Sequence, residues 1–375
     1  MTPLLEIRGL RTHFFTESGV AKAVDGVDLD VMPGEVLGLV GESGSGKSVT
    51  ALSILRLIPD PPGRIVGGEI RFKGRDLLKL SWDEIRAVRG REISMIFQEP
   101  MTSLNPVFTI GRQVMEMILT HEPGDKARAR ARGVEMLTRV GISDAATRMK
   151  QYPHELSGGM RQRVMIAIAL ALNPALLIAD EPTTALDVTI QAQILDLMLE
   201  LKERHEAGAI LLITHNLAVV AETCDRVAVM YGGKIQEVAP VRELFHNPLH
   251  PYTRGLLASL PRVDGERTER LTTIPGSVPD IHSLPVGCKF TTRCPERFEP
   301  CPDIEPPLIE ATPGHWVRCH LHDDCHGYFG RRGESNRLRQ GYGGPPELQA
   351  KAEEQAPIGG SQKQDPPYVQ EASRS

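Results

Sequence analysis

The sequence lacks the features that would mark a membrane-spanning, an exported or a nucleic-acid-binding protein. No apolar run approaches the roughly 20 residues that span a bilayer; the best candidate, VMIAIALAL, is short and stops at Asn173 and Pro174. The opening residues MTPLLEIRGLRTHFF lack the basic start and apolar run of a signal peptide. The net charge of −5 gives no general attraction to nucleic acid. We therefore expect a soluble, cytoplasmic chain that binds no nucleic acid and reaches a membrane only through partners.

What is present suggests an ordinary globular protein of roughly two domains. The chain has 375 residues, of which 41% are hydrophobic and 24% are charged. Short strands and turns are expected up to about residue 75, and from residue 157 helices alternate with apolar strands, which favours a parallel α/β sheet. The composition becomes proline-rich and lacks a regular pattern after Pro261, and it becomes poor in apolar residues after Gly327. These changes predict three parts: an α/β domain at 1–261, a cysteine-bearing domain at 262–326 and a disordered tail at 327–375.

Residues 110–150 have the pattern of helices and contain a basic run from Lys126 to Arg132. Such a run also occurs in nucleic-acid-binding patches. Here the charges alternate at i and i+2, so they are distributed around a helix rather than gathered on one face. We favour a solvated helix.

The stretch GESGSGKS at 41–48 matches the phosphate-binding pattern G-x-x-x-x-G-K-[ST]. The apolar run VLGLV precedes it as a buried strand, and a helix is expected from about Ser48 to Leu57. Glycines allow backbone N–H groups to surround phosphates, and the helix N-terminus adds its dipole. Lys47 is placed to reach the β- and γ-phosphates, and Ser48 to ligate Mg²⁺.

Two further motifs complete a nucleotide site. In ALLIADEP an apolar strand ends at Asp180, which is placed to hold Mg²⁺, and Glu181 follows as a candidate base for an attacking water. In LSGGMRQR, Ser157 is a good helix N-cap, and the adjacent glycines expose backbone amides that suit an anion. Since the chain already has one phosphate loop, the second anion-binding helix suits a nucleotide held by another subunit.

These motifs, in this order, resemble those of the ATP-binding subunits of ABC transporters. GESGSGKS resembles the Walker A motif, LSGGM the signature motif and LLIADEP the Walker B motif. The resemblance covers about residues 4–260 and implies a P-loop α/β fold with an antiparallel β subdomain and a helical subdomain. It also implies a head-to-tail dimer with two ATP molecules between each Walker A motif and the opposing signature. The cysteine-bearing segment would follow as a small irregular C-terminal domain.

The resemblance also assigns roles to single residues. It implies that Glu181, His215 and Gln98 are catalytic, and that Ser48, Gln98 and Asp180 hold Mg²⁺. The adenine-stacking aromatic corresponds to Phe14, although its neighbour Phe15 remains an alternative. Met160 stands where the general family has Gln, but no member of the catalytic set is missing, so we expect hydrolysis. The nucleotide-binding residues would be Phe14, Gly41, Ser43, Gly44, Ser45, Gly46, Lys47, Ser48, Val49, Ser157, Gly158, Gly159 and Asp187.

Two segments resemble one branch of this family. YPHELSGGMRQRVMIAIALALNP and NPLHPYTRGLLASLP are similar to segments of dipeptide, oligopeptide and nickel importers, as are IPGSVPD and GCKFTTRCP. The resemblance implies two membrane-spanning permease subunits, a second homologous ATPase subunit and an extracytoplasmic binding protein. It places the chain at the cytoplasmic face of the membrane and makes peptides the leading cargo, with nickel complexes and oligosaccharides open.

Two other classes of function remain alternatives. A soluble, non-transport ABC ATPase would be expected to contain tandem cassettes or a long coiled-coil insertion, and neither is seen here. A non-hydrolysing structural subunit would be expected to lack one of Lys47, Glu181 and His215, and all three are present. We therefore favour the transport ATPase.

Four cysteines cluster near the end of the ordered sequence, separated by 5, 6 and 17 residues. Cytoplasmic disulfides are disfavoured, and zinc usually comes with tighter cysteine pairs. Four thiolates at looser spacings suit an iron–sulfur cluster, and the resemblance implies a [4Fe–4S] cluster, as known in some members. Unrelated thiols and zinc remain alternatives. The expected ligands are Cys288, Cys294, Cys301 and Cys319; Cys325, His315, His320 and His322 are extra candidates, and Cys224 is expected in the core.

Overall fold

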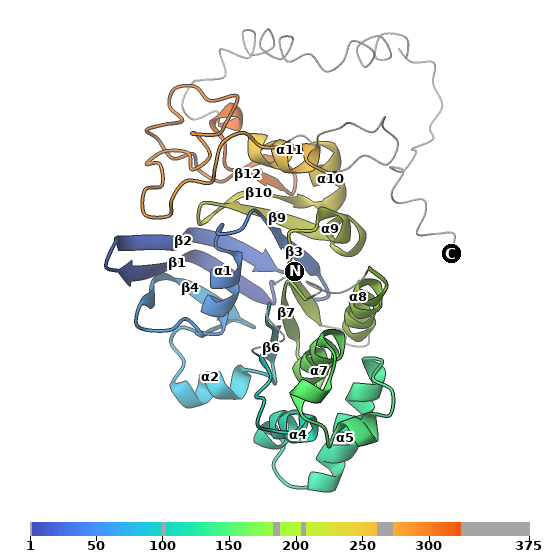
Figure 1. Ribbon diagram of the computed structural model, residues 1–375. Coiled ribbons are helices and arrows are strands. Elements are labelled where there is room, and N and C mark those ends of the chain that lie inside the picture. Colours follow the sequence, from blue (N-terminus) through green and yellow to red (C-terminus); the bar gives the residue numbers. More distant parts are fainter. Residues whose placement is uncertain (1, 99–102, 183–187, 204–207, 261–272, 324–375) are drawn as a thin grey trace, which may run out of the picture.

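Two sheets organise the protein, for which the computed structural model describes residues 2–98, 103–182, 188–203, 208–260 and 273–323. The smaller sheet is antiparallel, with strand order β2-β1-β4-β5 (Figure 1). It is the antiparallel subdomain that the sequence predicted. Its strands are β1 (Leu5–Thr16), β2 (Gly19–Val31), β4 (Gly63–Phe72) and β5 (Arg75–Asp76).

The larger sheet has the order β11-β12-β10-β9-β3-β8-β7-β6, and neighbours from β9 to β6 are parallel. Every residue of β3, β7 and β8 is buried, which is why these strands are continuous apolar runs in the sequence. A tight turn at Gly232–Gly233 joins β9 and β10 as a hairpin. The bounds are β3 (Val36–Val40), β6 (Ile93–Ile96), β7 (Leu176–Asp180), β8 (Ala209–Ile213), β9 (Arg226–Tyr231), β10 (Lys234–Pro240), β11 (Ile309–Thr312) and β12 (His315–Val317).

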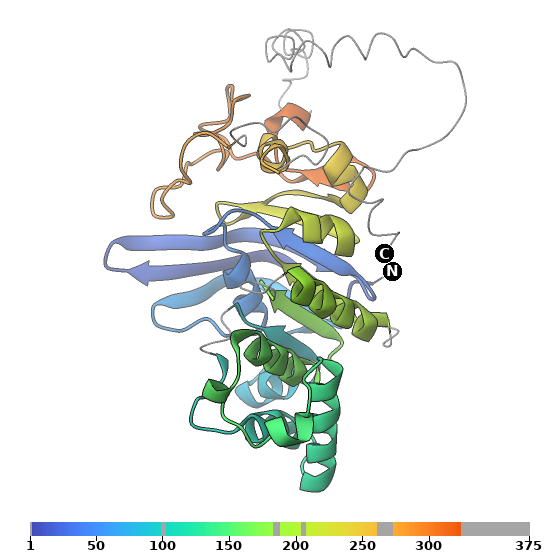
Figure 2. The ribbon, with the colours of Figure 1, turned by 45° about the vertical axis from the view of Figure 1, so that its right-hand side comes forward.

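Helices cover the larger sheet and form a separate helical region. In both views α7, α8 and α9 lie along one side, while β1 and β2 project from the other (Figures 1 and 2). The first helix is shorter than predicted and ends at Ile54. The bounds are α1 (Lys47–Ile54), α2 (Trp82–Val88), α4 (Ile110–His121), α5 (Lys126–Arg139), α6 (Ala145–Arg148), α7 (Gly158–Leu170), α8 (Val188–Glu203), α9 (Leu217–Thr223), α10 (Val241–His246) and α11 (Pro251–Ala258), with short 3₁₀ turns at Pro153–Glu155 and His320–His322.

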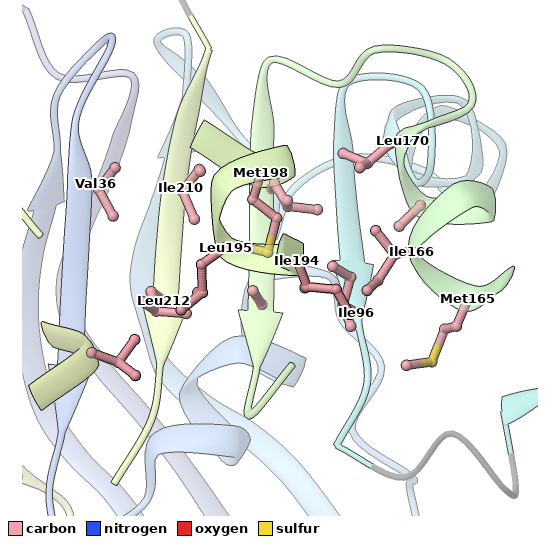
Figure 3. Packing of buried hydrophobic residues seen from close by; sticks show 14 of the residues in the cluster. Val36, Ile96, Met165, Ile166, Leu170, Ile194, Leu195, Met198, Ile210 and Leu212 are labelled. Carbon is pink, nitrogen blue, oxygen red and sulfur yellow. The ribbon is translucent and has the colours of Figure 1, made fainter. Parts of the chain in front are cut away.

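The core under the helices is built from branched and aliphatic side chains. Ile166 of α7 lies close to Ile96 of β6, and Leu195 of α8 lies beside Leu212 of β8 (Figure 3). Each such fully buried side chain contributes about 1.5–3 kcal/mol relative to an exposed one. A second apolar cluster fills the opposite side, between the larger sheet, the antiparallel sheet and α1. The parallel strands are therefore held from both sides, and the loops at their ends have a rigid support.

The helical region consists of α4 to α7 and includes the basic run. Asp125 caps α5 by accepting the backbone N–H of Ala127 at 2.7 Å. Lys126, Arg128 and Arg130 are exposed, whereas α5 buries its small and apolar residues. This distribution agrees with the solvated-helix interpretation.

The C-terminal segment contains two strands that the sequence did not predict. β12 pairs antiparallel with β10 and with β11, so the segment extends the larger sheet. β12 is only three residues long, and a strand of that length leaves no readable alternation in the sequence. The division at residue 261 stays a prediction, and residues 327–375 lie outside the described residues. None of the described helices is both long enough and apolar enough to cross a membrane.

Candidate functional site

Four parallel strands deliver the predicted catalytic residues to one edge of the larger sheet. β3 ends before Gly41, β6 before Gln98, β7 at Asp180 and β8 before His215. The carboxyl ends of neighbouring parallel strands lie at the same edge, which is where ligands bind in open α/β sheets. The sheet order β3-β8-β7-β6 therefore gathers residues that lie far apart in the chain.

The phosphate loop requires glycine at two positions. Gly41 has φ +154°, and a Cβ there would overlap the carbonyl oxygen of Met230. Gly46 has φ +104°, and a Cβ there would overlap the carbonyl oxygen of Ala23. The loop thus packs against β2 and β9 through bare backbone, and substitution at either position would displace it.

Lys47 is buried inside this loop. Its Nζ donates to the carbonyl oxygens of Gly41 at 2.8 Å and of Glu42 at 3.0 Å. Burial lowers the pKa of Lys47, while the carboxylates of Glu181 and Asp180 raise it. The ammonium group therefore sits within the loop and close to the acidic residues at the end of β7. Reaching a phosphate requires it to exchange carbonyl oxygens for phosphate oxygens.

The first turn of α1 has free donors. Its N-cap is Gly46, which provides no side-chain hydrogen bond, so the amides of Lys47, Ser48 and Val49 receive no side-chain cap. Uncapped amides at a helix start suit an anion. Ser43 and Gly44 complete the loop, and a Cβ on Gly44 would meet nothing within 4 Å.

Asp180 and Ser48 form an oxygen-rich pair that fits a magnesium ion. Asp180 is 3% exposed, and burial raises the pKa of its carboxyl group, although a hydrogen bond from Ser48 lowers it. Its Oδ1 has no hydrogen-bond partner among the described residues. A buried carboxylate oxygen beside a serine hydroxyl is the donor chemistry that Mg²⁺ prefers.

Glu181 and His215 meet across the ends of β7 and β8. His215 Nδ1 lies 3.2 Å from Glu181 Oε1. Glu181 has φ +49°, an unusual value for a side-chain-bearing residue, and its backbone N–H donates to Ile213 at 2.8 Å. Strained backbone of this kind is common at functional sites. The bend directs the carboxylate out of the sheet edge toward the exposed histidine.

The signature motif begins α7, which is a different helix from the one that follows the phosphate loop. Ser157 caps α7 as predicted, since its Oγ accepts the N–H of Met160 at 3.3 Å, and Gly158 and Gly159 begin the helix. α7 packs against α4, α5 and β6, whereas α1 packs against β1, β2 and β7. Ser157 and Gly158 are exposed, so this helix start is open to a partner. Asp187 lies outside the described residues.

Two further predicted residues are Gln98 and Phe14, of which the first is exposed and the second is half-buried. Gln98 is exposed, two residues beyond β6. Phe14 in β1 packs beside Gly63 and Ile58, whereas Phe15 is 49% exposed with the Arg64 guanidinium 5.9 Å above its ring. The choice between the two aromatics for adenine stacking stays a prediction.

The four clustered cysteines line one small cavity, together with His250 and Phe298. Its volume is about 10 Å³, room for about one water molecule. Burial raises the pKa of Cys288 to about 11 and that of Cys294 to about 12. The members of the cluster are Cys288, Cys294, Cys301 and Cys319.

The iron–sulfur cluster stays a prediction. As the side chains stand, no group of three or more His, Cys, Asp or Glu in the described part of the chain is arranged to hold a metal ion. The candidate histidines contact other groups: His315 contacts Glu237 at 2.7 Å, His320 the Ile304 carbonyl at 2.9 Å and His322 the Leu249 carbonyl at 3.3 Å. Cys224 is a buried core residue, as expected, and Cys325 lies outside the described residues.

Sequence reasoning missed a contact between the phosphate loop and residues 273–323, which contain the four clustered cysteines and are called the cysteine segment below. Arg293 and Glu42 form an ion pair across 251 residues of chain. Neither residue belongs to a motif with a fixed spacing to the other, so no pattern along the chain could have indicated the pair.

Comparisons with known proteins agree with this site. Residues 24–184 match a family described as "ABC transporter", and residues 236–301 match "Oligopeptide/dipeptide transporter, C-terminal region". The oligopeptide transport ATP-binding protein AppD of Bacillus subtilis (strain 168) is 53% identical over 324 residues, which are 86% of this chain and 98% of that protein. The dipeptide transport ATP-binding protein DppD of the same organism is 50% identical, over 86% of this chain and 96% of that protein.

A solved structure extends the likeness to the fold. The dimeric, post-hydrolysis structure of the ATP-binding cassette MJ0796 with ADP and Pi has a TM-score of 0.58 and 27% identity, over 64% of this chain and 99% of that one. The fold, the loop geometry and the long matches together lead to one conclusion. The chain belongs to the ABC transporter ATPases, in the branch of the oligopeptide and dipeptide transport ATP-binding proteins.

Proposed function

We propose that this chain binds MgATP at the edge formed by β3, β6, β7 and β8, and hydrolyses it to drive uptake of dipeptides or oligopeptides through separate membrane subunits. The observation that carries the proposal is the convergence of Lys47, Asp180, Glu181 and His215 at that edge. The names of the relatives support a peptide cargo. Nickel complexes and oligosaccharides are the alternative cargoes.

The residues of the edge divide the chemistry among them. Lys47 and the uncapped amides of α1 bind the phosphates, and Ser48, Asp180 and Gln98 hold Mg²⁺ directly or through water. The bound ion neutralises charge on the β- and γ-phosphates. Because Asp180 Oδ1 is buried without a partner among the described residues, its carboxylate gains a favourable contact when the ion binds.

Glu181 is the proposed base. Its carboxylate accepts a proton from the water that attacks the γ-phosphate. His215, in contact at 3.2 Å, orients that carboxylate and reaches the γ-phosphate from its exposed position. Glu181 directly follows Asp180, which is proposed to hold Mg²⁺, and it contacts the exposed His215. This position suits a base that must accept a proton from an entering water.

The signature motif completes the site of a second subunit. Ser157, Gly158 and Gly159 lie on a helix that does not pack against α1, so they are suited to a nucleotide held by the partner. Asp187 is proposed at the same interface. The partner is expected to be a homologous ATPase subunit.

An open groove in the helical region is the proposed contact with the permease. It has a volume of about 750 Å³ and lies between α4, α5 and α6, lined by Met115, Leu119, Arg130 and Met149 among others. Val107, in the segment just before α4, is 69% exposed. Loss of the γ-phosphate would move Gln98 and, with it, this region. A crosslinking scan of residues 99–112 should therefore find the membrane subunit.

The direct test is co-purification and transport. The full chain, expressed with its two membrane subunits and the partner ATPase, should co-purify with them at the cytoplasmic face of the membrane. In proteoliposomes the complex should take up a labelled tripeptide only when ATP and the extracytoplasmic binding protein are supplied. A chain that hydrolyses ATP but never associates with membrane subunits would instead support a soluble, non-transport ATPase.

We further propose that Cys288, Cys294, Cys301 and Cys319 hold a [4Fe–4S] cluster with a structural or redox-sensing role. The support is that all four thiols face one cavity. Because this cavity has room for about one water, the four side chains would have to move apart to hold the cluster. The ATP site is complete without the cluster, so hydrolysis does not use it.

Colour and metal content test the cluster. Anaerobically purified protein should be brown, with broad absorbance near 400 nm and about four irons per chain. Cys294→Ser should remove the colour and loosen the surrounding segment without preventing ATP binding. Cys224→Ala, a matched change of a buried thiol outside the cavity, should keep it. A colourless protein with one zinc per chain would contradict the iron–sulfur proposal.

A further inference from the structure

The phosphate loop is attached to the cysteine segment by an ion pair. Arg293 Nη1 donates to Glu42 Oε2 at 2.6 Å, and Arg293 Nη2 donates to Glu42 Oε1 at 3.1 Å. The Arg293 side chain is only 4% exposed, and Glu42 is the second residue of GESGSGKS. Two-pronged pairs of this kind fix both distance and orientation. The loop is therefore fixed from a part of the chain outside the cassette motifs.

Glu42 is held at its backbone as well as at its side chain. Its N–H donates to the Tyr252 hydroxyl at 2.9 Å, and its carbonyl oxygen accepts from Lys47 Nζ at 3.0 Å. One residue thus links α11, the cysteine segment and the amine that is proposed to bind phosphate. A shift of Glu42 moves the hydrogen-bond acceptors of Lys47.

Arg293 is itself rigidly placed. Its Nε donates to the Pro275 carbonyl at 3.1 Å, and its guanidinium lies 5.8 Å from the centre of the Tyr231 ring. Phe290, three residues earlier, packs edge-on against the same tyrosine at 5.4 Å. Arg293 directly precedes Cys294, one of the four cysteines around the cavity. The position of the guanidinium therefore depends on how the cysteine segment is folded.

The pair also matters for charge. A carboxylate within the phosphate loop repels the phosphates of a nucleotide, and an arginine that neutralises it removes this repulsion. Loss of Arg293 would leave the Glu42 side chain without its ion pair and its negative charge without a neutralising partner. Loss of the Glu42 charge alone would remove the anchor and the repulsion together, so its net effect is smaller.

We propose that Arg293 is a positioning residue of the ATP site, which holds and neutralises Glu42 so that the phosphate loop and Lys47 are set for phosphate binding. The inference rests on the proposed nucleotide-binding role of the loop. It assigns the cysteine segment a direct influence on nucleotide affinity.

The test compares Mg-ATP affinity in purified full-length variants, with thermal unfolding measured alongside. Arg293→Gln should weaken ATP binding by about tenfold, the size expected for residues coupled in one network. Glu42→Gln should weaken it by less than about threefold, and the double variant should bind more tightly than Arg293→Gln alone. Arg293→Lys keeps the positive charge but cannot form the bidentate pair, so its loss of ATP affinity should be intermediate. This variant also tests the proposal if Arg293→Gln does not fold.

Glu296→Gln provides the matched control. Glu296 pairs with Arg254 of α11 at 2.7 Å, so this change removes an ion pair of the same segment that does not reach the phosphate loop. It should leave ATP affinity unchanged. Equal weakening by Glu296→Gln would show that general loosening of the segment is the cause and would overturn the proposal.

Two other results would also overturn it. One is unchanged ATP affinity in Arg293→Gln, and the other is a double variant that binds as weakly as, or more weakly than, Arg293→Gln. Failure of the wild-type chain to bind ATP would instead contradict the proposed function, so the two failures are distinguishable.

Discussion

The nucleotide edge and the cysteine segment are built in opposite ways. At the edge, each functional residue follows a buried parallel strand, and the strand order alone brings Lys47, Asp180 and His215 together. The cysteine segment has two short strands and is attached by a few specific contacts, among them the Phe290 ring and the pair of Glu237 with His315. The edge inherits its rigidity from a large apolar core, to which the segment adds Cys288, Phe290 and Cys301. The rest of the segment depends on individual polar and aromatic contacts.

Glu305 illustrates the second kind of attachment. Its carboxylate lies 2.8 Å from Lys234 Nζ of β10 and 3.1 Å from Lys289 Nζ beside Cys288. Both lysines are nearly buried, so the pairs are less screened by solvent than surface pairs are. Changes at the edge should therefore alter chemistry and leave folding intact. Most changes in the segment should alter stability, and Arg293 is the exception because it contacts the phosphate loop.

The largest expected effect is at the edge. Glu181→Gln keeps the size and hydrogen bonding of the side chain but removes the proton acceptor. In the assembled transporter, ATP turnover should fall by about 10²- to 10⁴-fold, while ATP binding is kept and an ATP-bound dimer accumulates. The measurement is phosphate release together with size-exclusion chromatography in ATP. Undiminished hydrolysis by pure variant complex would refute the assignment of the base.

A smaller effect is expected where the segment meets the sheet. Glu237 is fully buried in β10, and it accepts from His315 and from the backbone amides of Leu249 and His250. Glu237→Gln places an amide group against these donors and should lower the free energy of unfolding by about 1–3 kcal/mol. Glu310→Gln, an exposed change in β11, should cost less than about 0.5 kcal/mol. Urea unfolding of both variants measures the difference, and equal costs would contradict this account.

Glu237 should also make the free energy of unfolding depend on pH. Burial raises the pKa of Glu237, but hydrogen bonds from His315 and two backbone amides counteract burial, and the net pKa is lowered. A carboxyl group whose pKa is lower in the folded state stabilises the fold above its unfolded pKa of about 4.3. This stabilisation is lost as the pH falls through the folded value. The stability gap between wild type and Glu237→Gln should therefore narrow below about pH 4; a gap that widens would contradict it.

The smallest expected effect lies at the contact between the two regions. Tyr252→Phe removes the hydroxyl that accepts the Glu42 N–H and changes little else in the aromatic cluster with Tyr231 and Phe290. Loss of one neutral hydrogen bond should weaken Mg-ATP binding by about threefold. Isothermal titration of the full-length protein measures it. A tenfold loss would mean that Tyr252 is as important to the loop as Arg293, and no loss would mean that its hydrogen bond does not hold the loop.

More of the nucleotide edge than of the cysteine segment could be predicted from the sequence, and the reason is physical. The strands VLGLV, ALLIA and AILLI could be predicted because a strand buried on both faces must be apolar throughout. The loop GESGSGKS could be predicted because only glycine tolerates the backbone near Met230 and Ala23. In contrast, β12 is three residues long, and Cys288 faces Cys319 only because the chain folds back between them.

The sequence by itself determined the parallel α/β cassette, the order of its motifs and the residues that meet at the nucleotide edge. These depend on local rules, namely periodicity, strand ends and glycine backbone, which act over a few residues. Only the tertiary structure decided that Glu305 joins β10 to the cysteine segment, that Glu237 is buried against His315, and that Arg293 holds the phosphate loop. Each of these is a contact between charged residues far apart in the chain, and no spacing along a sequence encodes which buried charge will meet which partner.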